Sequence, residues 1–269
     1  SHLVHFRAPV MKKTARLLKT ALLMPFFDGK RFLLEEKTKF LTLGIDYDSG
    51  VRATIESGLV GERPPWISAH LILFAGLALR NYQAPNILEI GTFEAQTTRF
   101  LSHYFPKSDI TTIELPEDDP IYLSTYSRET SGGRGQVEER MHANLAKTQA
   151  MQLRVNSFFL PAQCDKNFDL VWIDGGHMYP EIAWDACNAF HLCKDGGILV
   201  FDDVVLHAKP SDRRYLSQGM ATILEYIARR SPCRVTFLMK YVHPYSSGLP
   251  RQRRYIAVVE KAPPIPGDG

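Results

Sequence analysis

The chain from residue 85 onward alternates short apolar runs with amphipathic stretches. Apolar runs that end at Gly, Pro or charged residues predict strands at 86–90, 110–114, 153–159, 168–173 and 197–201. Helical spacing of apolar positions predicts helices between them, at 97–104, 138–151 and 179–192. Strands that alternate with helices are typical of a parallel sheet that is covered on both faces.

The C-terminal part adds a helix at 219–230 and two further strand-like runs, at 234–241 and 254–260. A loop rich in Pro, Ser and Gly joins these two runs, which predicts an antiparallel hairpin at one edge of the sheet. We therefore expect an α/β fold with a doubly wound, mostly parallel, seven-stranded sheet and an antiparallel C-terminal hairpin.

The first 84 residues show a different pattern, with a basic amphipathic stretch at 12–27 and a strongly apolar helix at 68–81. Between them, Asp48, Ser49 and Gly50 have the composition of a turn. We divide the chain into an N-terminal helical region at 1–84, a main domain at 85–262 and a tail at 263–269. The helical region is expected to form a lid or substrate wall, or a surface for homodimer formation. The glycine-containing segment 127–135 is predicted to be a mobile loop.

Composition excludes several classes of protein. With 45% hydrophobic and 23% charged residues, the 269-residue chain is neither disordered nor fibrous. Four Cys residues without a CxxC pair indicate reduced thiols, as in a cytoplasmic protein. The longest apolar stretch, 67–79, is too short to cross a membrane.

Charge is distributed unevenly, although the net charge is only +3. Residues 205–254 contain ten Lys and Arg against two Asp and Glu, so the rest of the chain is net negative. Such a segment is usually a solvated surface, but it is also suited to attract an anionic substrate. Because no nucleic-acid-binding motif is recognisable, we expect a small-molecule partner rather than nucleic acid.

Acidic residues surround the turn that follows the first predicted strand. Glu89 and Glu94 flank Gly91, and Glu114 closes the second strand. Ligands of open α/β sheets bind at the carboxyl ends of the strands, where Glu114 could accept hydrogen bonds from two ribose hydroxyls. A dinucleotide would need the G-x-G-x-x-G motif, which is missing here. Acidic residues favour a cationic nucleoside instead, and S-adenosylmethionine carries a sulfonium, an ammonium and an adenosine. In the alternative interpretation, Gly91 only forms a turn and Glu114 is a solvated strand end.

Three further carboxylates lie at the ends of neighbouring strands. Asp174 closes the fourth strand, and Asp202 and Asp203 close the fifth. A βαβ crossover brings adjacent strand ends together, so these carboxylates are expected to converge and repel one another. A divalent cation such as Mg²⁺ would remove this repulsion and would lower the pKa of a bound substrate hydroxyl. His177, three residues after Asp174, is a candidate general base.

Other interpretations of these residues stay open. Asp202 and Asp203 could cap a helix or bind the backbone of the following loop, and Asp174 could contact the cofactor without a metal ion. His177 could orient Asp174 or Tyr179 instead of taking a proton itself.

The motifs at 85–260 resemble those of the class I S-adenosylmethionine-dependent methyltransferases. The segment from Glu89 to Ala95 is similar to their motif acidic-x-Gly-x-x-x-Gly, with Ala95 in place of the second Gly. The resemblance implies a Rossmann-like fold, in which Glu114 binds the ribose and Asn156 and Ser157 lie near the adenine. The expected cofactor-binding residues are Glu89, Gly91, Thr92, Glu114, Asn156, Ser157 and Asp174.

The acidic strand ends resemble those of the metal-dependent O-methyltransferases. In the catechol type an Asp and an Asp-Asn pair hold Mg²⁺, so Asp203 stands in place of the Asn and His177 in place of a catalytic Lys. The macrocin and mycinamicin sugar O-methyltransferases are more similar, and there a metal-bound Asp is the proposed base. The resemblance therefore implies a metal site of Asp174, Asp202 and Asp203, with His177 or Asp174 as the base.

We therefore expect a cytoplasmic, S-adenosylmethionine-dependent O-methyltransferase that acts on a small natural-product, sugar or phenolic hydroxyl with Mg²⁺ or another divalent cation. A metal-independent N- or O-methyltransferase and a non-catalytic S-adenosylmethionine-binding protein are the alternatives.

Overall fold

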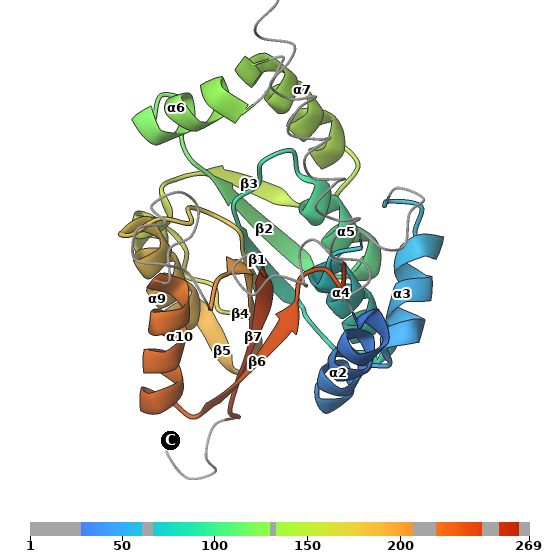
Figure 1. The fold of residues 1–269 in the computed structure, drawn as a ribbon. Helices are drawn as coiled ribbons and strands as arrows, with labels where there is room; N and C mark the ends of the chain where they lie inside the picture. The colour runs from blue at the N-terminus through green and yellow to red at the C-terminus, as the bar shows by residue number, and fades with distance from the viewer. Residues whose placement is uncertain (1–27, 61–66, 130–132, 207–218, 244–252, 264–269) are drawn as a thin grey trace, which may run out of the picture.

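A single sheet of seven strands organises the part of the chain that the computed structural model describes, which is residues 28–60, 67–129, 133–206, 219–243 and 253–263 (Figure 1). The strands are β1 Asn86–Ile90, β2 Asp109–Glu114, β3 Met151–Arg154, β4 Phe168–Ile173, β5 Cys193–Val204, β6 Cys233–Met239 and β7 Tyr255–Lys261. Their order is β3-β2-β1-β4-β5-β7-β6. β7 is antiparallel to both of its neighbours, and the other pairs are parallel, which confirms the predicted fold class.

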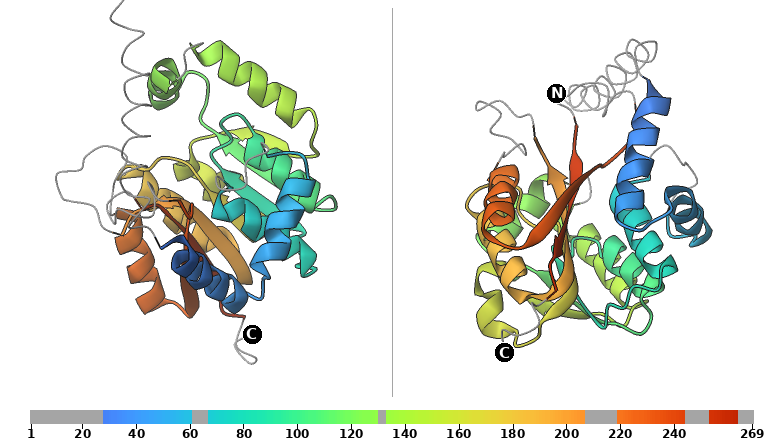
Figure 2. Two further views of the ribbon diagram at one scale, coloured as in Figure 1. Left: turned by 45° about the vertical axis from the view of Figure 1, so that its right-hand side comes forward. Right: turned by 90° about the horizontal axis from the view of Figure 1, so that it is seen from below.

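Helices cover both faces of this sheet, and Figure 2 shows α9 and α10 on one face and α2 to α5 on the other. Their bounds are α2 Gly29–Thr42, α3 Tyr47–Glu56, α4 Ala69–Leu79, α5 Gln96–Tyr104, α6 Pro120–Glu129, α7 Gly133–Leu145, α8 Leu160–Gln163, α9 Glu181–Leu192 and α10 Gly219–Arg230. A single 3₁₀ turn, η3 Ser157–Phe159, precedes α8. None of the helices in these described ranges is long and apolar enough to cross a lipid bilayer.

Successive residues of β4 pack against different cores, because side chains alternate between the two faces of a strand. Leu170 and Trp172 belong to the core beneath α4 and α5, whereas Val171 and Ile173 belong to the core beneath α9 and α10. Because both faces of β4 are buried, its sequence is a nearly continuous run of apolar residues.

The third strand and the helix before it differ from the sequence prediction. β3 ends at Arg154, and residues 157–159 form the 3₁₀ turn instead of continuing the strand. The Oδ1 atom of Asn156 accepts a hydrogen bond from the Phe158 N–H (2.9 Å), so this side chain caps the turn and stops the strand. The preceding helix α7 ends at Leu145, before the predicted 151.

The predicted loop at 127–135 is largely helical at both ends. α6 extends to Glu129 and α7 begins at Gly133, and only 130–132 lie outside the described residues. α6 itself was not predicted, although the sequence holds its start signal. Pro120 is its first residue, and Asp119 Oδ1 accepts a hydrogen bond from the Ile121 N–H (2.8 Å).

The predicted turn at residues 48–50 is also helical. Asp46 caps α3 by accepting a hydrogen bond from the Ser49 N–H (2.8 Å). Gly50 lies in the first turns of that helix, where a Cβ atom would meet the backbone oxygen of Ile72 at 2.9 Å. The glycine therefore allows α3 to pack closely on α4. The predicted helix at 12–27 lies outside the described residues.

α4 places the N-terminal helices in the same core as the sheet. Its sequence is apolar on all sides, as expected of a buried helix. Phe74 is fully buried, and its ring meets the ring of Trp172 edge to face at 5.6 Å. At the start of the helix, the Ala69 N–H donates a hydrogen bond to the Lys240 carbonyl oxygen (2.9 Å), just after β6.

Replacement of Phe74 tests whether the N-terminal helices and the sheet unfold together. We expect Phe74→Ala to reduce the free energy of unfolding by about 3–5 kcal/mol, because it leaves a cavity between α4 and β4. Urea unfolding followed by tryptophan fluorescence would measure this loss. Leu41→Ala, which removes a side chain that is 70% exposed, is the control and should change stability by less than about 0.5 kcal/mol. A separate early transition with an unchanged midpoint for the sheet would contradict a shared core.

Candidate active site

A cavity of about 830 Å³ opens at the carboxyl ends of β1, β2 and β4. The strand order reverses between β1 and β4, and this is where open α/β sheets bind their ligands. Six residues predicted from the sequence line the cavity: Gly91, Glu114, Asn156, Ser157, Asp174 and His177.

The lining of this cavity is acidic. Glu114, Asp174, Glu181 and Asp185 contribute carboxyl groups, and no Lys or Arg is found among its described lining residues. Such a wall attracts a cation and disfavours the pyrophosphate of a dinucleotide. The charge of the cavity therefore agrees with a sulfonium- and ammonium-bearing ligand.

The turn after β1 brings its backbone close to the end of β4. Gly91 has φ +99°, and a Cβ atom there would overlap the carbonyl oxygen of Asp174. Ala95, at the position of the second motif glycine, also has a positive φ of 56°. Both residues thus adopt the left-handed backbone that explains the glycines of the motif.

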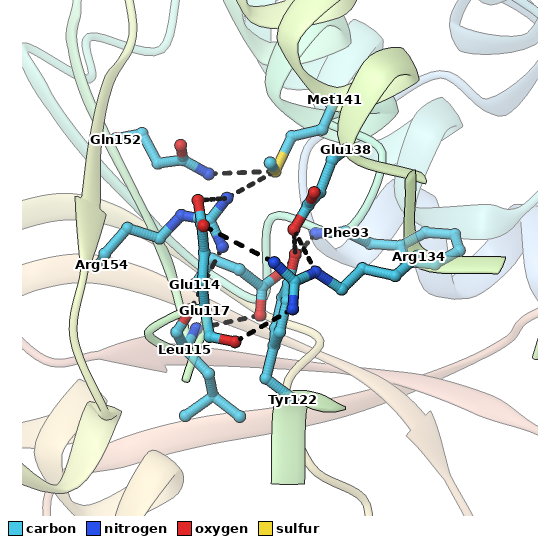
Figure 3. Close-up of polar contacts among 10 residues, drawn as sticks. All are labelled: Phe93, Glu114, Leu115, Glu117, Tyr122, Arg134, Glu138, Met141, Gln152 and Arg154. Atoms are coloured by element: carbon cyan, nitrogen blue, oxygen red, sulfur yellow. Dashed lines mark hydrogen bonds and ion pairs between the residues drawn. The ribbon is translucent and has the colours of Figure 1, made fainter. Parts of the chain in front are cut away.

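Glu114 is held in the cavity wall by two backbone groups of neighbouring loops. Its Oε2 atom accepts a hydrogen bond from the Phe93 N–H (2.8 Å), and its Oε1 atom accepts one from the Leu115 N–H (3.0 Å) (Figure 3). A carboxylate oxygen can accept more than one hydrogen bond. The fixed carboxylate is therefore suited to bind a pair of vicinal hydroxyls, as predicted for the ribose.

Glu89 and Thr92 lie behind the cavity wall instead of in it. The Oε2 atom of Glu89 accepts hydrogen bonds from the hydroxyls of Thr98 and Thr112 (2.6 Å for Thr112), and Thr92 Oγ1 lies 2.8 Å from Thr112 Oγ1. Neither residue is part of the cavity lining, so their contact with a cofactor stays a prediction. Burial raises the pKa of Glu89 to about 7, although the two threonine hydroxyls oppose this shift.

Asp174 joins the cavity to a second acidic group at the ends of β4 and β5. Its Oδ1 atom lies 3.5 Å from His177 Nε2. Partial burial and, next, the neighbouring carboxyl of Asp202 raise the pKa of Asp174 well above its ordinary value, and Lys240 opposes this shift. The predicted convergence of carboxylates is thus partly present, with Asp202 and Asp203 beyond Asp174.

Lys240, which the sequence analysis did not single out, supplies the positive charge of this group. Its Nζ atom lies 2.6 Å from Asp202 Oδ2 and 2.8 Å from Asp203 Oδ1. Burial alone would lower the pKa of this ammonium, but the two carboxylates raise it above its ordinary value. In the part of the chain that the structure describes, no three His, Cys, Asp or Glu side chains are grouped to hold a metal ion. The predicted Mg²⁺ site of Asp174, Asp202 and Asp203 therefore does not fit this arrangement.

His70 is a second functional candidate that was missed. Its ring packs on Trp172 with centroids 4.5 Å apart, and its Nδ1 atom lies 2.8 Å from Ser68 Oγ. Burial, and then the positive charge of Lys240, lower the pKa of His70 to about 3, so the imidazole is neutral at physiological pH. The available signal was the single polar residue within the otherwise apolar sequence of α4.

The comparison with known families agrees with this geometry, because residues 88–204 match the family model described as a methyltransferase domain. The matched segment is therefore a methyltransferase domain. The solved structures that resemble the chain include that of the O-methyltransferase TomG from Streptomyces achromogenes in complex with SAM. TomG is 20% identical to this chain, with a TM-score of 0.54, and the match covers 88% of this chain and 99% of TomG. Cofactor-bound Rv0187 from MTB has 17% identity, a TM-score of 0.51 and coverage of 81% and 89%. At these sequence identities, the similarity to solved structures shows the fold alone. In a separate comparison, no curated protein matches the chain.

The cavity lining also includes an acid that was not predicted, Asp185. Ser157 Oγ donates a hydrogen bond to Asp185 Oδ1 and accepts one from the Trp184 Nε1–H (3.0 Å). Burial raises the pKa of Asp185 to about 7. Asp185 is an isolated acid among the buried apolar residues of α9, and this position was the signal that could have identified it.

Helix α6 forms one side of the cavity, and α7 supports it through the polar network in Figure 3. The Tyr122 hydroxyl donates a hydrogen bond to Glu138 (3.1 Å), which also accepts one from Arg134 Nε (2.8 Å). The guanidinium of Arg154 lies over the Tyr122 ring and donates a hydrogen bond to the Leu115 carbonyl (3.2 Å). This network fixes Tyr122, a cavity-lining residue, beside the loop that follows Glu114.

Loss of the Glu114 carboxylate should weaken binding of S-adenosylmethionine. Hydrogen bonds to a charged group contribute about 1.5–3 kcal/mol, so we expect Glu114→Ala to raise the dissociation constant roughly 10- to 100-fold. Isothermal titration calorimetry would measure this dissociation constant. Glu117→Ala is the matched control, because Glu117 lies three residues further on and does not line the cavity. Equal affinities for wild type and Glu114→Ala would contradict the role of this carboxylate.

Glu89 should make the stability of the protein decrease as pH rises. Its folded pKa of about 7 lies above the unfolded value of 4.5, so between these values the folded state binds a proton that the unfolded state releases. The group's stabilising contribution is full below pH 4.5, and on the order of 3 kcal/mol of it is lost by the time the pH exceeds 7.

Glu89→Gln can accept from the same threonine hydroxyls and should lack this pH dependence. Urea unfolding without cofactor would give the free energy of unfolding at pH 5.5 and at pH 8. This free energy should decrease less between the two pH values for the variant than for the wild type. Glu117→Gln, at a side chain 56% exposed, serves as the control and should follow the wild type. If the free energy of unfolding changed with pH in the same way for Glu89→Gln and the wild type, Glu89 would be ionised in the folded state, and the prediction would be wrong.

Proposed function

We propose that this methyltransferase transfers the methyl group of S-adenosylmethionine to a hydroxyl group of a small natural-product, sugar or phenolic metabolite. The observation that carries the proposal is the position of Asp174, which lines the cofactor cavity and also borders the acidic group at the end of β5. A hydroxyl must lose its proton as it is methylated, and proton acceptors at this boundary suit that need. TomG, described as an O-methyltransferase involved in tomaymycin synthesis, provides a parallel for the reaction type.

The polar groups beyond Asp174 support a hydroxylated acceptor. His70, Asp202, Asp203 and Lys240 interact with one another at the carboxyl ends of β4, β5 and β6. These groups offer both donors and acceptors to a polar molecule. An acceptor bound among them would lie beside Asp174, at the edge of the cofactor cavity.

Among the described basic residues of the segment 205–254, two arginines make their contacts elsewhere. Arg229 pairs with Glu225 on the exposed face of α10, and Arg253 lies over the Phe32 ring. Arg213, Arg214 and Arg251 lie outside the described residues. Lys240, another described member of the segment, carries positive charge to the proposed acceptor site.

The chain's own groups would position the acceptor and remove its proton. When bound, S-adenosylmethionine would supply an electrophilic methyl group on a positively charged sulfur, which becomes a neutral thioether leaving group. Glu114 and the Gly91 turn would hold the nucleoside and methionine parts, which would reduce the entropic cost of the reaction. Asp174 takes the hydroxyl proton, and its raised pKa makes it a stronger base than an exposed carboxylate. His177, 3.5 Å away, orients Asp174 or receives the proton next.

Asp174→Asn should separate proton transfer from cofactor binding. A panel of phenols, sugars and macrolides incubated with isotopically labelled S-adenosylmethionine would identify the acceptor by mass spectrometry. With that acceptor, we expect Asp174→Asn to lower kcat about 10²- to 10⁴-fold, since general base catalysis contributes this much. The variant's affinity for S-adenosylmethionine should remain within several-fold of the wild type.

His177→Ala should lower kcat by about tenfold or more, because it removes the partner of Asp174. Wild-type kcat in Asp174→Asn would exclude this carboxylate as the base. A product methylated on nitrogen would overturn O-methyl transfer while leaving the cofactor site as described.

A further inference from the structure

Asp202 and Asp203 direct both of their carboxylates to one point, which a regular strand does not allow. Consecutive side chains of a strand point to opposite faces. Here the pairing of β5 with β7 shifts register between Phe201 and Val204, and Asp203 has a φ of +49°. This irregular backbone is unfavourable for a residue other than glycine and occurs most often at functional sites. It brings the two carboxylates to the same Lys240 ammonium.

Both backbone polar groups of Lys240, the N–H and the carbonyl, form hydrogen bonds. Its N–H donates a hydrogen bond to the Arg254 carbonyl (2.8 Å), and its own carbonyl accepts one from the Ala69 N–H at the start of α4. Its side chain is only 12% exposed and reaches across β7 to the end of β5. The backbone of Lys240 is therefore fixed by Arg254, just before β7, and by α4, and the two carboxylates hold its ammonium, so it is not a mobile surface charge.

The Lys240 ammonium uses the oxygen atoms that a metal ion would need. Asp202 Oδ2 and Asp203 Oδ1 are both within 2.8 Å of its Nζ atom. A Mg²⁺ ion would have to take these oxygens at about 2.0–2.1 Å, and the ammonium would have to leave. The side chain of Asp202 is 5% exposed, so the departure of Lys240 would leave a buried carboxylate without its counter-charge.

We propose that Lys240 takes the place of a divalent cation in this methyltransferase, as a positioning residue that holds Asp202 and Asp203 beside the acceptor site without a metal ion. The part of this inference that concerns turnover rests on the proposed function. The part that concerns cation binding does not, because it can be measured without an acceptor.

Binding of Mn²⁺ tests directly whether the Lys240 ammonium occupies the place of a divalent cation. Electron paramagnetic resonance on the full chain with S-adenosylhomocysteine should detect no stoichiometric Mn²⁺ binding by the wild type up to about 1 mM. Lys240→Ala should gain one Mn²⁺ per chain, because it exposes the carboxylates of Asp174, Asp202 and Asp203 to the ion. Lys240→Arg keeps the positive charge and should bind none. Thermal unfolding and cofactor binding would establish that each variant is folded.

Two binding results would overturn the proposal. One is a wild-type protein that binds one Mn²⁺ per chain and loses it on Asp202→Asn substitution. The other is a folded Lys240→Ala variant that binds no Mn²⁺, because the carboxylates would then not form a cation site. If Lys240→Ala does not fold, the wild-type titration still decides, and absence of binding there supports the proposal.

Turnover gives an independent measurement once an acceptor is known. The wild-type rate should be unchanged by EDTA, and Lys240→Ala should lose at least about tenfold in kcat and regain part of it with Mn²⁺ or Mg²⁺. A lysine with only a structural role would not be replaced by a metal ion. Inhibition of the wild type by EDTA would overturn the inference, whereas failure to find any acceptor would count against the proposed function and leave the Mn²⁺ result valid.

Discussion

The contact of Lys240 with the carboxylates of Asp202 and Asp203 allows several acids to share the carboxyl edge of the sheet. Each buried acid there is compensated in a different way. Threonine hydroxyls solvate Glu89, the Ser157 hydroxyl binds Asp185, and an ammonium neutralises Asp202. Because no Lys or Arg is among the described residues of the cofactor cavity, this compensation leaves the cavity itself acidic. An electrostatically negative wall can then attract a cationic methyl donor.

The backbone couples the cofactor cavity to the acidic group. The Asp174 N–H donates a hydrogen bond to the Ile90 carbonyl (2.9 Å), and the carbonyl of the same Asp174 lies against the Cα atom of Gly91. The ends of β1 and β4 are therefore held at a fixed spacing. A cofactor bound at Gly91 and an acceptor bound at Asp174 would keep a defined distance, which in-line transfer requires.

The sequence was most informative where local pattern and topology suffice. The bounds of β1 and β4 follow from continuous apolar runs, and the proximity of Asp174 to Asp202 follows from the crossover rule. Lys240 could not be found in this way. A C-terminal hairpin was expected, but the pattern did not show that β7 would lie between β5 and β6, and this order decides which side chain meets the end of β5. The burial of Glu89 against Thr98 and Thr112 was likewise not visible, because spacing along a motif does not show which face of a strand an acid occupies.

The N-terminal helices complete the acidic site, although the sequence divides them from the sheet. α4 contributes His70 to the surroundings of Lys240, and the first N–H of the helix binds the Lys240 carbonyl. Phe74 of the same helix packs on Trp172, two residues before Asp174 on β4. One helix thus fixes the backbone beneath the cation and the strand that carries the proposed base. The relative position of these two groups depends on α4 as much as on the sheet, so the residues before 85 help to define the site as well as to cover it.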